Sequence, residues 1–112
     1  MKPLSILHTE SSLGWGGQEI RILTEARGML DRGHRVTLLT PLEAEIFPAA
    51  KRKCIPVEAL NIAKKRIGPL LAMRDWLQRN GSQFDVINTH SSTDSWLVAV
   101  ALATLNGKPA LV

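Results

Sequence analysis

Strand-like and helix-like patterns alternate along the whole sequence, and this alternation constrains the fold more than any other feature. Short apolar runs of strand length occur at five places, residues 4–9, 35–40, 55–60, 84–89 and 108–112. Segments with the apolar spacing of helices separate them, at residues 17–32, 43–53, 69–79 and 95–105. Repeated β-α units with apolar strands predict an α/β fold, a Rossmann-like parallel sheet with helices on both faces.

This pattern also predicts where a ligand binds. A doubly wound sheet of this kind has strand order 3-2-1-4, with the fifth strand beside the fourth, and ligands bind outside the carboxyl ends where the order reverses. The first and fourth strands flank that point. The loops that follow them, residues 10–18 and 90–94, are the most polar loops of the chain. We therefore expect these two loops to lie on the same edge of the sheet.

The first of these loops is rich in glycine. Gly14, Gly16 and Gly17 precede Gln18 and Glu19, which fall in the expected first turn of a helix. Unpaired backbone amides and the helix dipole make such a helix start suitable for an anionic ligand. The alternative is a surface loop whose glycines serve only turn geometry. The loop alone does not decide between the two.

Several helix details follow from local signals. Pro69 is expected at the first position of its helix, with Leu70, Leu71, Trp76 and Leu77 as core candidates. Ser91 and Asp94 have the spacing of a capping box, although aspartate replaces the usual glutamate. The helix at 95–105 is apolar nearly all round, which predicts burial between layers with Trp96 as a packing residue.

Length and composition limit the class of protein. A chain of 112 residues forms one domain at most. No apolar run approaches the roughly 18–20 residues of a membrane span, and the first one is too short for a signal peptide, so we expect a cytoplasmic location. The single cysteine, Cys54, excludes an internal disulfide and a multi-cysteine metal site. Neither a metal ion nor a cofactor is expected.

The net charge of +4 is concentrated in two clusters, Lys51-Arg52-Lys53 and Lys64-Lys65-Arg66. Neither cluster is interleaved with aromatic residues and the sequence has no nucleic-acid-binding motif, so no nucleic-acid partner is expected. A solvated surface is the simpler interpretation of each cluster. The other is attraction to anionic lipid headgroups or to phosphorylated acceptors, which implies peripheral contact with the inner face of a membrane.

Three well-known classes of doubly wound domain fit the sequence poorly. A dinucleotide-binding fingerprint would have its third glycine at Glu19, and the acidic residue expected after the second strand is Thr40 instead. A P-loop is excluded because no Gly-Lys-Ser/Thr follows the glycines. A flavodoxin-like or receiver domain would have acidic residues clustered at the strand ends, which this chain lacks.

Three segments together resemble the N-terminal domain of retaining glycosyltransferases of family 4. They are Leu-Gly-Trp-Gly-Gly-Gln-Glu at 13–19, the turn Arg-Gly-His-Arg-Val at 32–36, and Phe-Asp-Val-Ile-Asn-Thr-His at 84–90. Members of this family are GT-B enzymes, with two Rossmann-like domains and the active site in the cleft between them. The family commonly has a second histidine two residues before the last, where this sequence has Asn88.

The resemblance implies roles for the glycine-rich loop. Gly16 and Gly17 match the loop that approaches the diphosphate of the donor and the reacting sugar, where a side chain would block access. Gln18 and Glu19 would lie at the mouth of that loop and bind substrate. Glu19 is equally well explained as a helix N-terminal acid. Trp15 could stack on a sugar face or cover the exposed edge of the core.

The same resemblance makes His90 the candidate catalytic residue. It would form a hydrogen bond to a sugar hydroxyl or stabilise oxocarbenium-like charge, with Ser91 beside it as a substrate-binding residue. The alternative role for His90 is to cap the next helix. His8 and His34 are expected to be structural, and His34 to lie in a turn.

By the same comparison, residues 1–112 are a partial N-terminal, acceptor-side domain truncated in the fifth strand, without the C-terminal donor-binding domain. The implied enzyme transfers a sugar from a nucleotide-sugar to a glycan or lipid-linked acceptor, for example in cell-envelope polysaccharide or lipopolysaccharide synthesis. The chain alone is expected to be inactive. The alternative is a non-catalytic Rossmann-like module that binds an anionic ligand or a partner protein.

Overall fold

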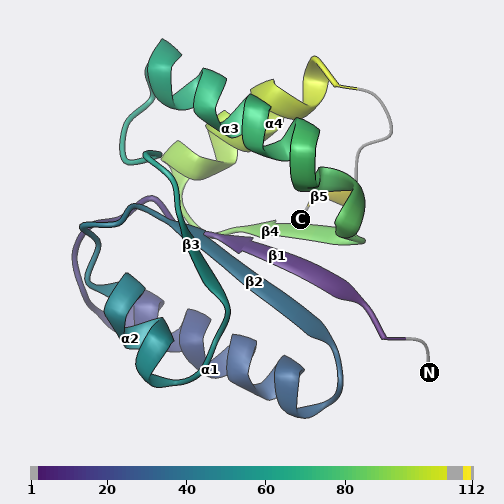
Figure 1. The fold of residues 1–112 in the computed structure, drawn as a ribbon. Coiled ribbons are helices and arrows are strands. Elements are labelled where there is room, and N and C mark those ends of the chain that lie inside the picture. The colour runs from purple at the N-terminus through teal and green to yellow at the C-terminus, as the bar shows by residue number, and fades with distance from the viewer. Residues whose placement is uncertain (1–2, 106–109, 112) are drawn as a thin grey trace.

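Five parallel strands form one sheet in the computed structural model, which describes residues 3–105 and 110–111 (Figure 1). The strands are β1 (Ser5–Thr9), β2 (Arg35–Thr40), β3 (Val57–Ala59), β4 (Val86–Thr89) and β5 (Ala110–Leu111). Their order, β3-β2-β1-β4-β5, confirms the predicted order. The expected helix end at residues 106–107 lies outside the described residues, and so do residues 108, 109 and 112 of the expected fifth strand. The fold class is therefore a Rossmann-like α/β sheet, as predicted.

Four α-helices cover the two faces of the sheet. They are α1 (Gly17–Asp31), α2 (Ile46–Arg52), α3 (Ile67–Asn80) and α4 (Ser92–Ala103), and a short 3₁₀ helix, η1 (Gly81–Gln83), follows α3. Helices α1 and α2 lie on one face, and α3 and α4 lie together on the other (Figure 1). Among the described residues, no helix is both long and apolar enough to cross a membrane.

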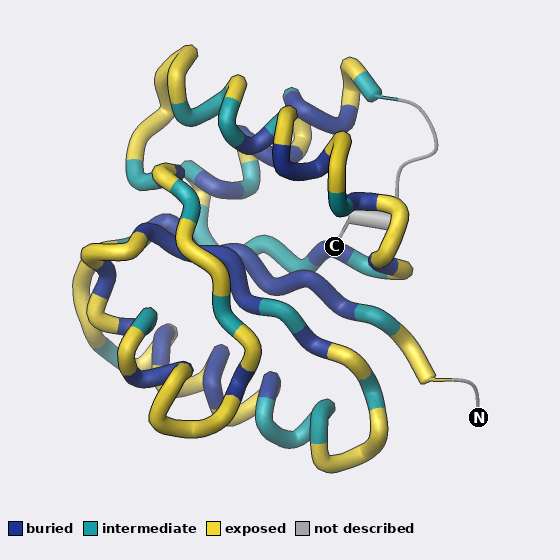
Figure 2. Tube along the Cα trace, in the orientation of Figure 1, coloured by how far each residue is buried: buried dark blue, intermediate teal, exposed yellow. Residues whose placement is uncertain are grey.

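Each face of the sheet has its own apolar core, visible as the dark interior of Figure 2. Alternate residues of a strand point to opposite faces, so Leu38 packs toward α1 and α2 while Leu39 packs toward α3 and α4. Fully burying one such leucine contributes about 1.5–3 kcal/mol. Because both cores are apolar, the polar residues at the strand ends are the candidates for a functional site.

Two predicted element boundaries are wrong for reasons that involve proline. Helix α2 begins at Ile46, and Pro48 is its third residue, in the first turn, where a missing amide costs no helical hydrogen bond. Strand β3 begins only at Val57, because Pro56 has no N–H and the amide of Ile55 donates to the Ala50 carbonyl at 3.0 Å. Strand β3 lies at the edge of the sheet, as the proline indicated.

The helices on the second face are less buried than the sequence suggests. Trp76 and Leu77 are buried as predicted, but Leu71 is 56% exposed and Met73 takes its place in the core. Helix α4 is also only buried on one side, and Trp96 is 41% exposed. The described chain places no layer outside α3 and α4, so an apolar outer face remains at the surface.

Pro69 is the third residue of α3, not the first as predicted.

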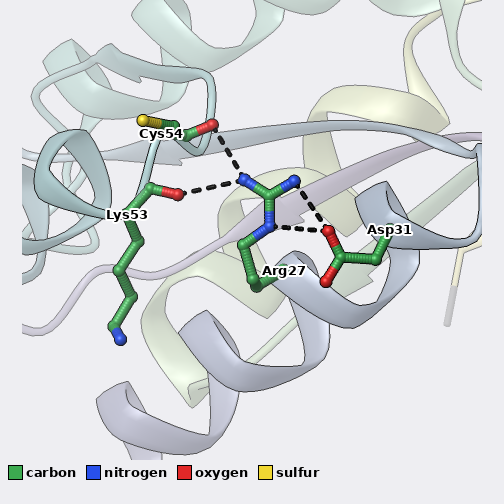
Figure 3. A network of polar contacts seen from close by, with 4 residues as sticks. All are labelled: Arg27, Asp31, Lys53 and Cys54. Atoms are coloured by element: carbon green, nitrogen blue, oxygen red, sulfur yellow. Dashed lines mark hydrogen bonds and ion pairs between the residues drawn. The ribbon is translucent and has the colours of Figure 1, made fainter.

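An arginine joins the ends of the two helices on the first face (Figure 3). The Arg27 side chain donates to the carbonyl oxygens of Lys53 at 3.1 Å and Cys54 at 3.4 Å. It also pairs with the Asp31 carboxylate at 3.0 Å. Cys54 is exposed and has a φ of 56°, the left-handed conformation that ends α2. The contacts link α1 to the chain that enters β3.

Candidate active site

The carboxyl ends of β1 and β4 lie side by side, and the loops that follow them meet. The two strands pair in parallel, with His8 opposite Asn88 and Thr9 opposite Thr89. Beyond them, the hydroxyl oxygens of Ser11 and Ser91 are 2.6 Å apart. We call this edge, with residues 10–19 and 90–94, the site rim. The prediction that the two polar loops share one edge is confirmed.

A buried carboxylate, Asp94, holds the site rim together. Its oxygens accept hydrogen bonds from the Thr9 hydroxyl at 2.5 Å, the Ser11 hydroxyl at 3.1 Å and the backbone N–H of His90 at 3.0 Å. The N–H of Ser91 donates to the Asp94 carboxylate at 3.1 Å and the Ser91 side chain accepts the backbone N–H of Asp94, which together form the predicted capping box at the start of α4. The Ser91 hydroxyl also donates to the Asp94 carboxylate. Asp94 therefore fixes the position of His90 relative to β1.

A second buried carboxylate shapes the glycine-rich loop. Glu10 is fully buried, and its carboxylate accepts the backbone N–H groups of Ser11 at 2.9 Å and Ser12 at 3.3 Å. The side-chain amide of Gln18 donates to the other carboxylate oxygen. Gln18 thus reaches back across the loop to Glu10. No motif marks Glu10 as a functional residue, although its position directly after an apolar strand is a signal for one.

The glycines at the start of α1 are not required by the fold. Gly16 has a φ of −174°, which any residue adopts, and a Cβ built on it would meet only a Glu19 oxygen, at 3.6 Å. A Cβ on Gly17 would have no neighbour within 4 Å. Glu19 itself is buried, 5% exposed, against this loop. The space in front of the two glycines is therefore open to a ligand.

The surroundings of Trp15 are compatible with both of the roles expected for it, stacking on a sugar and covering the edge of the core. The side chain is 46% exposed. It lines a hollow of about 340 Å³ together with residues in and next to α2, among them Glu45 and Arg52. Trp15 therefore lies beside α2 and keeps part of its side chain exposed.

His90 is paired with His8, for which only a structural role is expected from the sequence. Nδ1 of His8 lies 2.8 Å from Nε2 of His90, the ring centroids are 5.0 Å apart, and the ring planes differ by 13°. Burial, with a smaller contribution from His90, lowers the pKa of His8 to about 4. Burial also lowers the pKa of His90, against the attraction of nearby carboxylates. Both rings are therefore neutral at pH 7.

His34 and Asp85 lie at the amino ends of the strands, opposite the carboxyl ends that form the site rim. His34 follows the left-handed Gly33 and its Nδ1 accepts the N–H of Leu4 at 3.0 Å, as a turn residue does. Asp85 accepts the N–H of Ser5 at 2.8 Å. Neither residue contacts the site rim.

An apolar groove of about 590 Å³ runs beside α1 over β1 and β4, with Ile6, Met29 and Val86 in its lining and His8 and Asn88 nearest the site rim. Among residues 3–105 and 110–111, no group of three or more His, Cys, Asp or Glu side chains could hold a metal ion.

A sequence model described as Glycosyltransferase Family 4 matches residues 15–112. No curated protein sequence matches the chain significantly. The match begins inside the glycine-rich loop and includes all of the chain that follows it, including the loop of His90.

Solved structures with the same fold include three with high structural similarity. The chain superposes on a glycosyltransferase from Rickettsia africae with a TM-score of 0.77 at 16% identity, covering 99% of this chain and 29% of that one. On Acinetobacter baumannii MurG it superposes with a TM-score of 0.71 at 16% identity, covering 97% of this chain and 34% of that one. On Anabaena Alr3699/HepE in complex with UDP-glucose the TM-score is 0.66 at 20% identity, with 88% of this chain and 26% of that one covered. The chain thus spans about a quarter to a third of the length of these proteins.

Proposed function

Because this chain belongs to Glycosyltransferase Family 4, we propose that residues 1–112 form the acceptor-side, N-terminal domain of a retaining GT-B glycosyltransferase. The enzyme would transfer a sugar from a nucleotide-sugar to a glycan or lipid-linked acceptor of the cell envelope. A C-terminal donor-binding domain would supply the other wall of the cleft. The observation that carries the proposal is the meeting of the His90 loop and the open glycine-rich loop at the site rim.

In this proposal each residue of the site rim has its own role in binding or positioning the substrate. The open space at Gly16 and Gly17 admits the diphosphate and the reacting sugar to the N-terminal amides of α1. His90, which is half-buried at the same site rim, forms a hydrogen bond to the transferred sugar. The half-buried Ser91 and the exposed side chain of Trp15 are available to the sugar, and Glu19, buried against the glycine-rich loop, supports the loop from within. Gln18 acts through Glu10 by holding the loop in place.

His90→Ala tests this assignment in the enzyme that carries the domain. We expect kcat to fall roughly a hundredfold, about 3 kcal/mol, with a smaller change in donor KM, because the lost contact is to the reacting sugar and not to the nucleotide. The measurement is steady-state transfer from UDP-glucose, with UDP release as the readout. UDP-glucose is chosen because a structural relative binds it.

Two controls accompany that experiment. The 112-residue chain alone should show no turnover, because one wall of the cleft cannot orient the donor or stabilise charge. Thermal melting of His90→Ala must match the parent. Normal melting with full kcat would mean that His90 only supports the start of α4, and donor binding without any transfer by the whole enzyme would favour a binding module.

We also propose that the enzyme contacts anionic membranes through one basic cluster. Lys64, Lys65 and Arg66 are exposed in the loop that leaves the carboxyl end of β3, on the same edge as the site rim. Ile67 and Leu71, one turn apart on α3, are 70% and 56% exposed. Basic side chains beside exposed apolar ones suit the surface of an anionic bilayer.

The second basic cluster provides a matched control for membrane binding. Residues 51–53 carry the same three positive charges but lie at the end of α2, before the amino end of β3, where Arg52 shares a hollow with Trp15. Replacing residues 64–66 by glutamine should weaken binding to vesicles of phosphatidylglycerol and phosphatidylcholine roughly a hundredfold, since each charge contributes about 1 kcal/mol. The same change at 51–53 should have little effect. Equal losses in sedimentation assays would mean that net charge alone attracts the protein.

A further inference from the structure

The pairing of His8 with His90 raises a question of proton position. The two nitrogens that face each other, Nδ1 of His8 and Nε2 of His90, are 2.8 Å apart, so one of them carries a proton and the other accepts it. Both rings are neutral at pH 7 because burial lowers both pKa values. Each ring therefore has one N–H and one bare nitrogen.

The remaining nitrogen of His8 decides between the two arrangements. Nε2 of His8 is buried and has no hydrogen-bond partner among the described residues. A proton there would be an orphaned buried donor, which proteins avoid more strictly than an unused acceptor. The hydrogen-bond network therefore assigns the proton of His8 to Nδ1, from which it donates to Nε2 of His90.

We infer that His8 is a positioning residue that holds His90 in the tautomer with its proton on Nδ1. His90 then offers an N–H to a ligand at the site rim, and its partner atom must be an acceptor, a sugar hydroxyl oxygen or a phosphate oxygen. In the opposite tautomer His90 would present a bare nitrogen and would bind a hydroxyl hydrogen. The identity of the ligand rests on the proposed function. The tautomer assignment rests only on the hydrogen-bond geometry of the two rings.

The charged groups around the pair are compatible with this assignment. The groups that act on His90 are the carboxylates of Glu10, Asp94 and Glu25, which raise its pKa, and Arg21, which lowers it. Asp94 is bonded to the backbone N–H of His90 and to hydroxyl groups, so its carboxylate does not compete for the ring. His90 is the titratable neighbour that acts on the pKa of His8. Burial remains the largest influence on both rings.

Nitrogen-15 NMR of the chain tests the tautomer directly, because protonated and bare imidazole nitrogens have distinct chemical shifts. The sequence has three histidines, and the half-buried His34, whose Nδ1 accepts the N–H of Leu4, serves as a reference ring with its proton on Nε2. At pH 7 we expect a protonated Nδ1 and a bare Nε2 for both His8 and His90. His8→Phe should return His90 to the mixed tautomers of a free ring, and His8→Asn, whose side-chain N–H lies near the position of Nδ1, should restore the signature. A proton on Nε2 of His90 in the parent chain would overturn the inference.

The pH dependence of stability gives a second readout. A histidine with a pKa of about 4 when folded and 6.5 when unfolded binds more protons in the unfolded state between these values, so stability is full above pH 6.5 and is lost as pH falls toward 4. Between pH 7 and pH 5 the unfolding constant should rise roughly 20-fold from His8 alone. His8→Phe should remove this component in urea titrations. An unchanged pH dependence would mean that His8 is not held neutral, which contradicts the inference.

Kinetics in the enzyme that carries the domain separate this inference from the proposed function. His8→Phe should lower kcat about tenfold without changing the KM for UDP-glucose, His8→Asn should recover most of the rate, and His34→Gln should have no effect. If NMR shows the expected tautomers and kcat does not respond, the role of His90 in transfer is wrong and the positioning is right. If the NMR signature is absent, the positioning is wrong whatever the rate.

Discussion

Gly16→Val should reduce sugar transfer by the enzyme that carries this domain by on the order of a thousandfold. The branched side chain would occupy the space in front of α1, where the proposed function places the diphosphate and the reacting sugar. A Cβ at this position meets only the Glu19 carboxylate, at 3.6 Å, so the rest of the side chain has to extend into the ligand space. The measurement is UDP release from UDP-glucose at saturating acceptor.

The fold should tolerate this change. The φ of −174° at Gly16 is available to valine, and the expected loss of stability is about 1 kcal/mol because valine is a poor helix N-cap. Gly68→Val is the matched control, since Gly68 lies in the first turn of α3 and a Cβ there has no neighbour within 4 Å. A Gly16→Val enzyme that transfers at the parental rate would show that no ligand approaches this loop.

Asp94→Ala should lower the free energy of unfolding of the chain by about 4 kcal/mol. The substitution removes the acceptor for Thr9, Ser11, Ser91 and the N–H of His90 and leaves the buried hydroxyl of Thr9 without its carboxylate partner. For a domain of this size the expected fall in Tm is about 15 °C. Urea denaturation with circular dichroism measures both quantities.

Two variants make the Asp94 experiment specific. Asp94→Asn keeps the size of the side chain but presents an N–H₂ group to a set of donors, so it should also destabilise, by about 2 kcal/mol. Asp85→Ala removes an exposed carboxylate that accepts one backbone N–H at the other edge of the sheet, and should cost less than about 1 kcal/mol. Equal effects of Asp94→Ala and Asp85→Ala would contradict the role of Asp94 as the link between β1 and α4.

The parts of the fold that depend on local signals were predictable from the sequence. The strand order follows from the alternation of β and α segments, and the start of α1 at Gly17 and its end before Gly33 follow from helix-capping preferences. The capping box of Ser91 and Asp94 also needs only four consecutive residues. Each of these features depends on residues that are neighbours in the chain.

Features that depend on distant contacts were not predictable in the same way. His8 is an ordinary strand residue in the sequence, and only the pairing of β1 with β4 brings it to His90, 82 residues away. The bond between the side chains of Gln18 and Glu10 has no sequence signature, and the family resemblance implies only that Gln18 lies at the mouth of the loop. The exposure of Leu71 and Trp96 depends on how many layers cover a helix, which apolar spacing does not encode.

The exposed thiol at the end of α2 gives this fold a natural attachment point for a spectroscopic label. Cys54 is the only cysteine of the chain, so a maleimide fluorophore would attach to every molecule at one known position. That position lies before the amino end of β3, whereas the site rim lies at the carboxyl ends of β1 and β4. The backbone of Cys54 is also bonded to Arg27 of α1. The dye should therefore report movements of α1 relative to α2 from a position outside the site rim.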